Sequence, residues 1–360
     1  MDARTSADKT SADKASADKA AASPLAPRRV TLDEARLYAA RVLERFGTLP
    51  ANAALTARAL VAAEADGLAT HGLSRLPSYS AMVASGKIDG HAVPVARRVA
   101  PAVLAVDAGN GFAYPAIETG LPQLEAITRE AGIGLMILRR SSHFGVAGQP
   151  VERLAEQGLV GLAFATAPAS IAPWGGRRAM FGTNPIAFAT PLKGRAPAVV
   201  DLSVAKVARG NLMAAAQRGE PIPEGWALDA EGRPTTDAKA GLGGTMVPMG
   251  EAKGTALAFI IEVMAAALTA STLSIDAPSF FDGEGPPAAL GQLVIAIDPS
   301  RGAGDAYLDH LERLARTIEA EPGARLPGTR RLANRDRAAG EGVVIGGALQ
   351  RALAGMGFTG

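Results

Sequence analysis

The stretch GIGLMILRRSSHFG, residues 132–145, combines a strand signal with the best candidate for catalysis in the sequence. Residues Gly134–Leu138 form a short apolar run of the kind found in buried strands. Gly132 lies two residues before the run and Gly134 begins it, but a third glycine is missing, so the GxGxxG fingerprint of a dinucleotide-binding turn is absent here. The polar residues after Leu138 are expected at the carboxyl end of the strand, where α/β proteins place ligand chemistry.

Helices and strands are predicted to alternate on both sides of this strand. The predicted helices cover residues 31–47, 50–66, 74–85, 115–131, 151–158, 252–270 and 306–319, and the predicted strands cover residues 101–107, 134–138, 160–165, 198–202 and 292–297. Alternation of this kind predicts an α/β chain with a covered sheet. Residues 277–291 are rich in glycine and proline and are predicted to form a long surface loop.

The amino terminus is predicted to be disordered up to residue 29. It repeats SADK three times and has too little apolar sequence to offset the entropy cost of ordering. A targeting peptide is the alternative, which four acidic residues in this segment disfavour. Ordered structure is expected from Thr31, because Thr31 and Glu34 have the spacing of a capping box.

Composition excludes several classes of protein. The formal net charge is +2, and the first 29 residues carry six basic and four acidic residues, so the rest of the chain is about neutral. A neutral body argues against a nucleic-acid or membrane-surface binder. Cysteine is absent, which excludes disulfides, thiolate catalysis and Cys-ligated metal sites, and no metal site is predicted. The most apolar segment, residues 256–270, is too short to span a bilayer, and a cytoplasmic location is expected.

Two of the four histidines are candidates for catalysis. His143 follows the strand at residues 134–138, and an imidazole there can donate a proton to a carbonyl oxygen as hydride arrives. The alternative is a histidine held by local backbone contacts. His71 lies in THG between two predicted helices, one turn before Arg75, whose planar fork suits a carboxylate or a sulfonate. There the alternative is a helix cap and a surface arginine. His91 and His310 are interpreted as structural or exposed.

Four further segments are weaker candidates for ligand binding. They are the turn FGTNP around Thr183, the acid Asp201 at a strand end, the GEAKG segment with Lys253 at a helix start, and the basic turn at residues 325–331. A helix start and a cluster of arginines both suit phosphate groups. Each segment also has a plain structural interpretation, as a turn, a cap or a solvated basic loop.

Taken in order, these segments resemble the malate/L-lactate/sulfolactate dehydrogenase (type-2) family from about residue 31 to 335. The matching pieces are THG, SSHFGVAG, APWGG, FGTNPIAFATP, VVDLSVAKVARGN, PIPEGWALDAEGRPTTD, PMGEAKG and LPGTRR. The resemblance implies an α/β, mixed-sheet, non-Rossmann fold with helical N- and C-terminal parts around a central cofactor domain. It also implies a homodimer. The expected domains are residues 30–87 with 305–360 (helical), 88–139 with 288–304 (small α/β) and 140–287 (NAD(P)-binding).

The resemblance also assigns roles to individual residues. It makes His143 the proton donor and acceptor, with His71 and Thr70 as further catalytic residues, and it makes Arg75 the ligand of the substrate carboxylate. Thr70 departs from the serine usual in the family. The expected cofactor contacts are His143, Phe144, Gly145, Val146, Ala147, Thr183, Asp201, Leu202, Ser203, Lys253, Arg325, Gly328, Arg330 and Arg331.

The implied function is an NAD(P)-dependent oxidoreductase that interconverts a small 2-hydroxy acid and its 2-oxo acid by hydride transfer. Residues 86–94, 206–211 and 279–287 resemble the sulfolactate dehydrogenase branch. The alternative is an NADPH-dependent reductase of cyclic imino acids, in which an acidic residue is expected where Asn211 stands. Asn211 cannot donate a proton in that way, although the sulfolactate branch usually has Lys there and Ser at Ala205. The cofactor is NADP or NAD, with Arg325, Arg330 and Arg331 favouring NADP.

Two other classes of protein are weighed against this interpretation. An inactive member of the family would bind the dinucleotide only, but such a protein needs none of His71, Arg75 and His143. A nucleic-acid-binding protein is suggested only by the sequence pI of about 9.0, which the neutral body of the chain disfavours.

Overall fold

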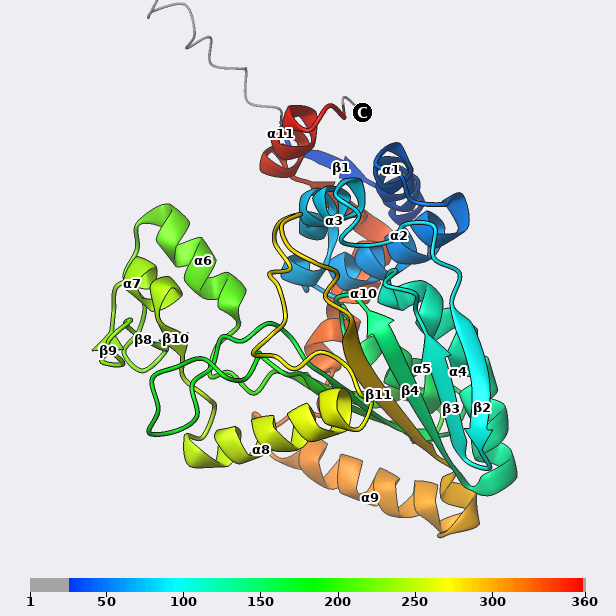
Figure 1. The fold of residues 1–360 in the computed structure, drawn as a ribbon. Coiled ribbons are helices and arrows are strands. Elements are labelled where there is room, and N and C mark those ends of the chain that lie inside the picture. Colours follow the sequence, from blue (N-terminus) through cyan, green and yellow to red (C-terminus); the bar gives the residue numbers. More distant parts are fainter. Residues whose placement is uncertain (1–25, 359–360) are drawn as a thin grey trace, which may run out of the picture.

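A seven-stranded sheet forms the centre of the computed structural model, which describes residues 26–358 (Figure 1). In spatial order its strands are β2 (Val95–Ala100), β3 (Val103–Asp107), β4 (Ile133–Ser141), β11 (Leu290–Ile297), β5 (Val160–Ala165), β6 (Ile186–Leu192) and β7 (Arg195–Leu202). Only β3 and β4 pair in parallel; all other neighbours are antiparallel. The predicted mixed-sheet α/β fold is confirmed, and it lacks the all-parallel sheet of a Rossmann fold.

The strand predicted at residues 134–138 is the inner strand β4. It pairs with β3 on one side and β11 on the other, so Ile137 lies opposite both Ala105 and Leu293. The pairing with β11 continues as far as Ser141, past a register shift between Leu290 and Gln292. This extension, which the apolar run alone did not predict, leaves His143 two residues beyond the strand end.

Helices α4 (Ala113–Ala131) and α5 (Gly148–Glu156) cover one face of the sheet. The helix α4 approaches the sheet closely at Gly120, where an added Cβ would lie 2.4 Å from the Met136 sulfur. A larger residue at position 120 would therefore push the helix away from the core.

Helix α8 (Ala252–Glu262) and the π-helical turn Val263–Ala267 lie across the other face. The single helix expected over residues 252–270 is thus wrong at its carboxyl end. The change of winding follows Glu262, whose carboxylate accepts hydrogen bonds from the Ser274 hydroxyl at 2.7 Å and the Asn184 amide at 2.8 Å. These bonds tie the end of α8 to the turn before β6 and to the segment that follows the π-helical turn.

A small lobe projects beside α8 (Figure 1). It consists of α6 (Arg209–Arg218), α7 (Ala238–Gly243) and the strands β8 (Ala227–Leu228), β9 (Pro234–Thr235) and β10 (Thr245–Met246). None of these elements was predicted, because the strands have only two residues each and α6 has a weak apolar pattern.

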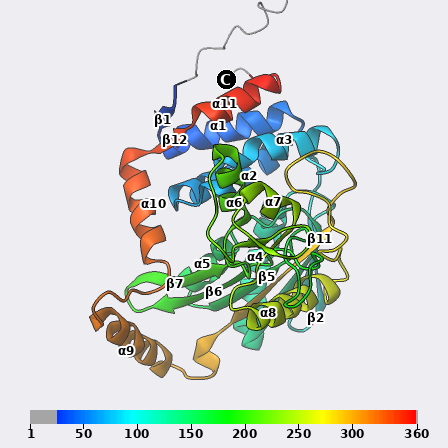
Figure 2. The same cartoon turned by 90° about the vertical axis from the view of Figure 1, so that its left-hand side faces the viewer.

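A helical layer lies above one end of the sheet (Figures 1 and 2). It contains α1 (Leu32–Arg45), α2 (Pro50–Ala65), α3 (Leu76–Ala84), α10 (Thr329–Glu341) and α11 (Gly347–Gly355), whereas α9 (Ala306–Ala320) runs along the far end of the sheet. The helix α1 begins with the predicted capping box, in which the Thr31 hydroxyl accepts from the Glu34 amide at 3.2 Å.

The predicted boundary of the amino-terminal tail is wrong. Residues 1–25 lie outside the described part of the chain, but Arg28–Val30 forms strand β1, which pairs with β12 (Val343–Ile345). Backbone hydrogen bonds to a segment more than 300 residues away order these residues, and Val30 is buried. The three-domain division of the chain stays a prediction; the seven-stranded sheet continues across its boundary at residue 139. No helix within residues 26–358 is both long enough and apolar enough to cross a membrane.

Candidate active site

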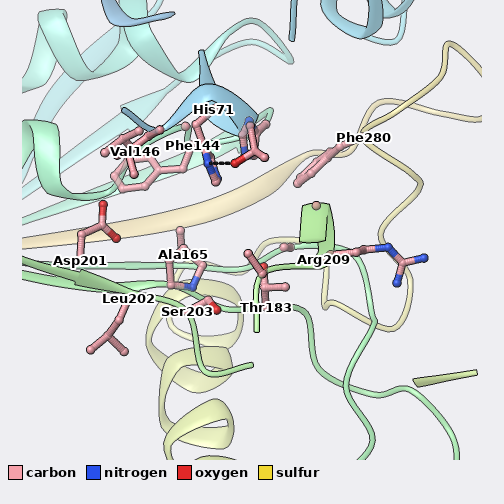
Figure 3. Close-up of a pocket in the computed structure, with 18 of the residues that line it drawn as sticks. His71, Phe144, Val146, Ala165, Thr183, Asp201, Leu202, Ser203, Arg209 and Phe280 are labelled. Atoms are coloured by element: carbon pink, nitrogen blue, oxygen red, sulfur yellow. Dashed lines mark hydrogen bonds between the residues drawn. The ribbon is translucent and has the colours of Figure 1, made fainter. Parts of the chain in front are cut away.

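A cavity of about 1310 Å³ lies between the helical layer, the sheet and the small lobe (Figure 3). It exceeds the 300–1,000 Å³ or so of ordinary small-molecule sites, so it has room for a dinucleotide together with a small acid. Its walls contain most of the predicted site residues: Thr70, His71, Arg75, His143, Phe144, Gly145, Val146, Thr183, Asp201, Leu202, Ser203, Arg325, Gly328, Arg330 and Arg331.

His143 lies half-buried in the wall of this cavity, in a network of aromatic side chains. Its Nδ1 is 2.8 Å from the Tyr79 hydroxyl, which in turn is 3.1 Å from the Tyr114 hydroxyl. The Phe280 ring packs on the imidazole, with ring centroids 5.1 Å apart. Since Nδ1 makes the only hydrogen bond of this ring within residues 26–358, Nε2 is the atom left for a substrate.

His71 lies next to His143 with its ring nearly parallel, 5.6 Å away between centroids. Its Nδ1 is 3.1 Å from the Thr70 hydroxyl. Two 3₁₀ turns form this loop, and Glu64 holds it by accepting a hydrogen bond from the Leu73 amide at 3.0 Å. A Cβ added at Gly72 would lie 2.2 Å from the Glu64 carboxylate, so a larger residue would displace the carboxylate that holds this loop.

Arg75 has the geometry of an anion clamp. Its Nε donates to the Thr70 carbonyl at 2.7 Å, and its guanidinium lies over the Phe281 ring, 4.9 Å from the centroid. One terminal nitrogen, Nη1, is buried and has no hydrogen-bond partner among the described residues. An unpaired buried donor costs free energy, which a substrate carboxylate would recover.

The surroundings keep both imidazoles neutral near pH 7. Burial, followed by the positive charge of Arg75, lowers the pKa of His71 to about 4. The same two causes, together with His71, hold the pKa of His143 well below its usual value of 6.5. An anion bound at Arg75 would oppose the repulsion from Arg75 and raise the pKa of His143 toward neutrality.

The expected cofactor segments come together along the sheet edge. Thr183 precedes β6 and Ser203 follows β7; the Val204 amide donates to the Thr183 carbonyl at 2.9 Å and so holds the two segments side by side. Asp201 is exposed toward the cavity and accepts from the Gly148 amide at 2.7 Å. The loss of solvation on burial of the carboxyl group raises the pKa of Asp201 to about 6, against the lowering effects of the Gly148 amide and of Arg331. Figure 3 shows Asp201 below Phe144 and Val146, and on the opposite side of the view from Arg209.

Of the expected cofactor contacts, two do not line the cavity and a third lines it with its guanidinium already paired. Lys253 is exposed at the start of α8 and does not line the cavity. Ala147 is buried in the core and does not line the cavity either. Arg331 lines the cavity, but its guanidinium is bound to Glu152 at 2.7 Å and Asp66 at 3.1 Å. Because this buried ion-pair network already occupies the fork, Arg331 is unsuited to hold a 2′-phosphate.

Arg325 and Arg330 keep the features expected of phosphate ligands. Both line the cavity, both are exposed, and neither makes an ion pair within residues 26–358. Gly328 between them has φ +89°, and an added Cβ would lie 3.2 Å from the Val199 carbonyl of β7. A glycine is thus needed to bring this basic turn against the sheet.

Five residues of the site were not predicted: Tyr79, Tyr114, Arg209, Phe280 and Phe281. Tyr79 had a local signal, because it follows Arg75 by four positions in a predicted helix and so shares its face. The two phenylalanines lie in a loop that had no such signal. Among residues 26–358, no group of three or more His, Asp or Glu side chains is arranged to hold a metal ion.

Known proteins resemble this chain over most of its length. Residues 30–354 match the family model described as malate/L-lactate dehydrogenase. The chain is 51% identical over 308 residues to a (2R)-3-sulfolactate dehydrogenase (NADP(+)) from Chromohalobacter salexigens, covering 86% of this chain and 92% of that protein. It is 42% identical over 327 residues to a Delta(1)-pyrroline-2-carboxylate/Delta(1)-piperideine-2-carboxylate reductase from Pseudomonas aeruginosa, covering 90% and 98%. The crystal structure of a delta1-piperideine-2-carboxylate reductase from Pseudomonas syringae superposes with a TM-score of 0.86 at 38% identity, covering 91% and 99%.

Proposed function

The chain belongs to the malate/L-lactate dehydrogenase family, and on that premise we propose that it is an NADP-dependent oxidoreductase that interconverts a sulfolactate-type 2-hydroxy acid and its 2-oxo acid. One observation carries the proposal. The unpaired guanidinium nitrogen of Arg75 and the imidazole of His143 line the same cavity as the segments expected to bind a dinucleotide. A carboxylate bound at Arg75 would place the neighbouring 2-oxo carbon within that cavity.

In this mechanism the residues of the chain bind, orient and protonate the substrate. The bound nicotinamide supplies the hydride for C2. Arg75 holds the carboxylate, and His143 Nε2 donates a proton to the 2-oxo oxygen, so that one hydride and one proton yield the 2-hydroxy acid. Tyr79 fixes the orientation of the His143 ring through Nδ1, and Phe280 shields it from water. His71 and Thr70 polarise the carbonyl or relay the proton.

NADP is the proposed cofactor because the similar sulfolactate dehydrogenase is named for NADP(+), and because Arg325 and Arg330 line the cavity without an ion pair to any described residue. Replacing both with glutamine is expected to raise the KM for NADPH by about 10²-fold, from the loss of charge-assisted bonds to the 2′-phosphate. The KM for NADH should change less than threefold. Steady-state kinetics with both cofactors measures this, with Arg313→Gln on the exposed face of α9 as control. Equal losses for NADH and NADPH would contradict the assignment.

The pH dependence of the two directions is expected to have opposite signs. Reduction needs protonated His143, whose pKa is lowered by burial and by Arg75; kcat/KM for reduction should therefore fall as pH rises. Oxidation needs the neutral imidazole, so its kcat/KM should be constant at alkaline pH and fall as pH drops through the same pKa. The measurement is kcat/KM for each direction between about pH 5 and 9, with the stability of the enzyme at each pH checked by preincubation. Reduction that becomes faster toward pH 9 would exclude His143 as the acid.

Reduction of cyclic imino acids is the second candidate, since similar proteins carry that activity in their names. Of the α6 residues that line the cavity, none is a carboxylate, and Asn211 is exposed outside it. Oxidation of NADPH and of NADH at 340 nm should be measured with sulfopyruvate, oxaloacetate, pyruvate and Δ1-piperideine-2-carboxylate. Turnover of the 2-oxo acids supports the proposal, whereas turnover of the imine alone moves the chain to the second candidate.

A homodimer is also proposed. The outward side of α8 and the turn after it carries Phe259, Ile260, Val263 and Leu268, each 40–60% exposed. Contiguous apolar side chains of this kind are typical of protein interfaces, and light scattering would measure the mass in solution. The cytoplasmic location stays a prediction.

A further inference from the structure

A second unpaired guanidinium, that of Arg209, lines the same cavity as Arg75. Arg209 is the first residue of α6 and is half-buried. It makes no hydrogen bond or ion pair through its side chain within residues 26–358, and burial lowers its pKa. A partly desolvated charge without a partner is unfavourable, unless a ligand supplies the opposite charge.

Arg209 lies at the end of the cavity that contains Thr70. Its neighbour Gly210 is so close to Thr70 that an added Cβ would be 2.8 Å from the Thr70 Cγ2 atom. The carbonyl of Thr70 is in turn the acceptor of the Arg75 Nε bond. Figure 3 shows Arg209 and Phe280 on one side of the cavity, with Asp201 and Val146 on the other. Because Phe280 packs on His143, the side of the cavity that contains Arg209 is also the side that contains His143, the proposed proton donor.

The charge at this end exceeds what a simple 2-oxo acid can neutralise. Arg75 has a buried nitrogen without a partner, the half-buried Arg209 makes no side-chain hydrogen bond or ion pair, and Asp201, across the cavity, is the only acidic residue in the cavity wall, all among residues 26–358. A substrate with one carboxylate satisfies one arginine and leaves the other without a partner. A substrate with two anionic groups satisfies both.

We propose that Arg209 binds a second anionic group on C3 of the substrate, a sulfonate or a carboxylate, and thereby selects dianionic over monoanionic 2-oxo acids. The inference rests on the proposed function, in which Arg75 holds the C1 carboxylate. Arg209 is then the specificity residue: it contributes to binding the far end of the substrate and takes no part in proton transfer.

The test compares Arg209→Gln with the wild-type enzyme at saturating NADPH. The KM for sulfopyruvate and for oxaloacetate should rise by about 10- to 100-fold, the effect of losing a charge-assisted contact, while kcat/KM for pyruvate stays within about threefold. Comparison of the two dianions identifies which anion Arg209 prefers. Arg218→Gln is the matched control, because it removes the same charge from the other end of α6, where Arg218 is exposed and paired with Glu220.

A binding measurement separates this inference from the proposed function. Calorimetry of the NADPH complex with 3-sulfopropionate and with propionate requires no turnover. Weaker binding of 3-sulfopropionate alone to Arg209→Gln supports the second anion site, even if the wild-type enzyme reduces no 2-oxo acid and the proposed function fails. Three results for Arg209→Gln would overturn the inference: an equal loss of affinity for both ligands, no loss of affinity for either ligand, or a higher KM for NADPH in place of weaker 3-sulfopropionate binding.

Discussion

Replacing His143 with alanine is expected to lower kcat for reduction of the 2-oxo acid by about 10²- to 10⁴-fold, the usual range for a general acid–base residue. The KM for NADPH should remain within a few-fold of the wild-type value. The reason is geometric: Nδ1 is bonded to Tyr79, Phe280 covers the ring, and only Nε2 is left to meet a substrate oxygen. Single-turnover measurement of NADPH oxidation would separate the loss in chemistry from any change in product release.

The matched control for this prediction is His310→Ala, which removes an exposed imidazole from α9, outside the cavity. The fold of His143→Ala should be checked by its melting temperature and by its affinity for NADPH. Turnover near the wild-type value in a folded variant would remove His143 from the mechanism. The neighbouring His71, whose pKa is lowered to about 4, would then be the next residue to test.

Replacing Arg75 with leucine is expected to lower kcat/KM by about 10³-fold for every 2-oxo acid, dianionic or not. Two losses combine in this estimate. The variant lacks the charge-assisted bonds to the carboxylate, and the substrate is then no longer oriented toward His143. Kinetics with sulfopyruvate and with pyruvate measures the effect; a similar loss for both distinguishes Arg75 from Arg209, whose variant should affect only the dianions.

Arg75→Lys tests the geometry of the clamp. Lysine keeps the charge but lacks the planar fork and the Nε that bonds to the Thr70 carbonyl, so only a small part of the activity should return. Arg41→Gln, an exposed change on α1, is the control for loss of a surface charge. Full activity in Arg75→Lys would mean that a point charge suffices, and unchanged kcat/KM in Arg75→Leu would exclude the clamp altogether.

Much of the fold was accessible from the sequence because its signals are local. The capping box at Thr31, the apolar run at residues 134–138 and the helix at residues 306–319 each depend on neighbours within a few positions, and all three are present. Predictions were wrong where distant segments decide the structure. The strand Arg28–Val30 exists only because Val343–Ile345 pairs with it.

For the site, the chemical groups can be identified from the sequence alone: two histidines next to hydroxyl residues, an arginine one turn after His71, and a basic turn near the carboxyl end. The packing of the folded chain determines which of these groups keep a donor or acceptor atom without a partner. In the sequence, Arg331 cannot be distinguished from the other arginines of the basic turn. In the folded chain, α10 packs near the end of α2 and α5, and the Arg331 guanidinium pairs with the carboxylates of Asp66 and Glu152. Arg209, to which the sequence motifs assign no role of its own, lines the cavity without an ion pair to any other residue between 26 and 358.

The same division applies to His143. Its position after a strand was evident from the sequence, but its hydrogen bond to Tyr79 joins residues 64 positions apart, and its neighbour Phe280 lies in a loop without regular structure. Local sequence patterns report backbone preferences and the burial of one face, since these act over one or two turns. Hydrogen bonds and charge pairs between distant side chains depend on how whole elements pack, and only the folded chain brings them together.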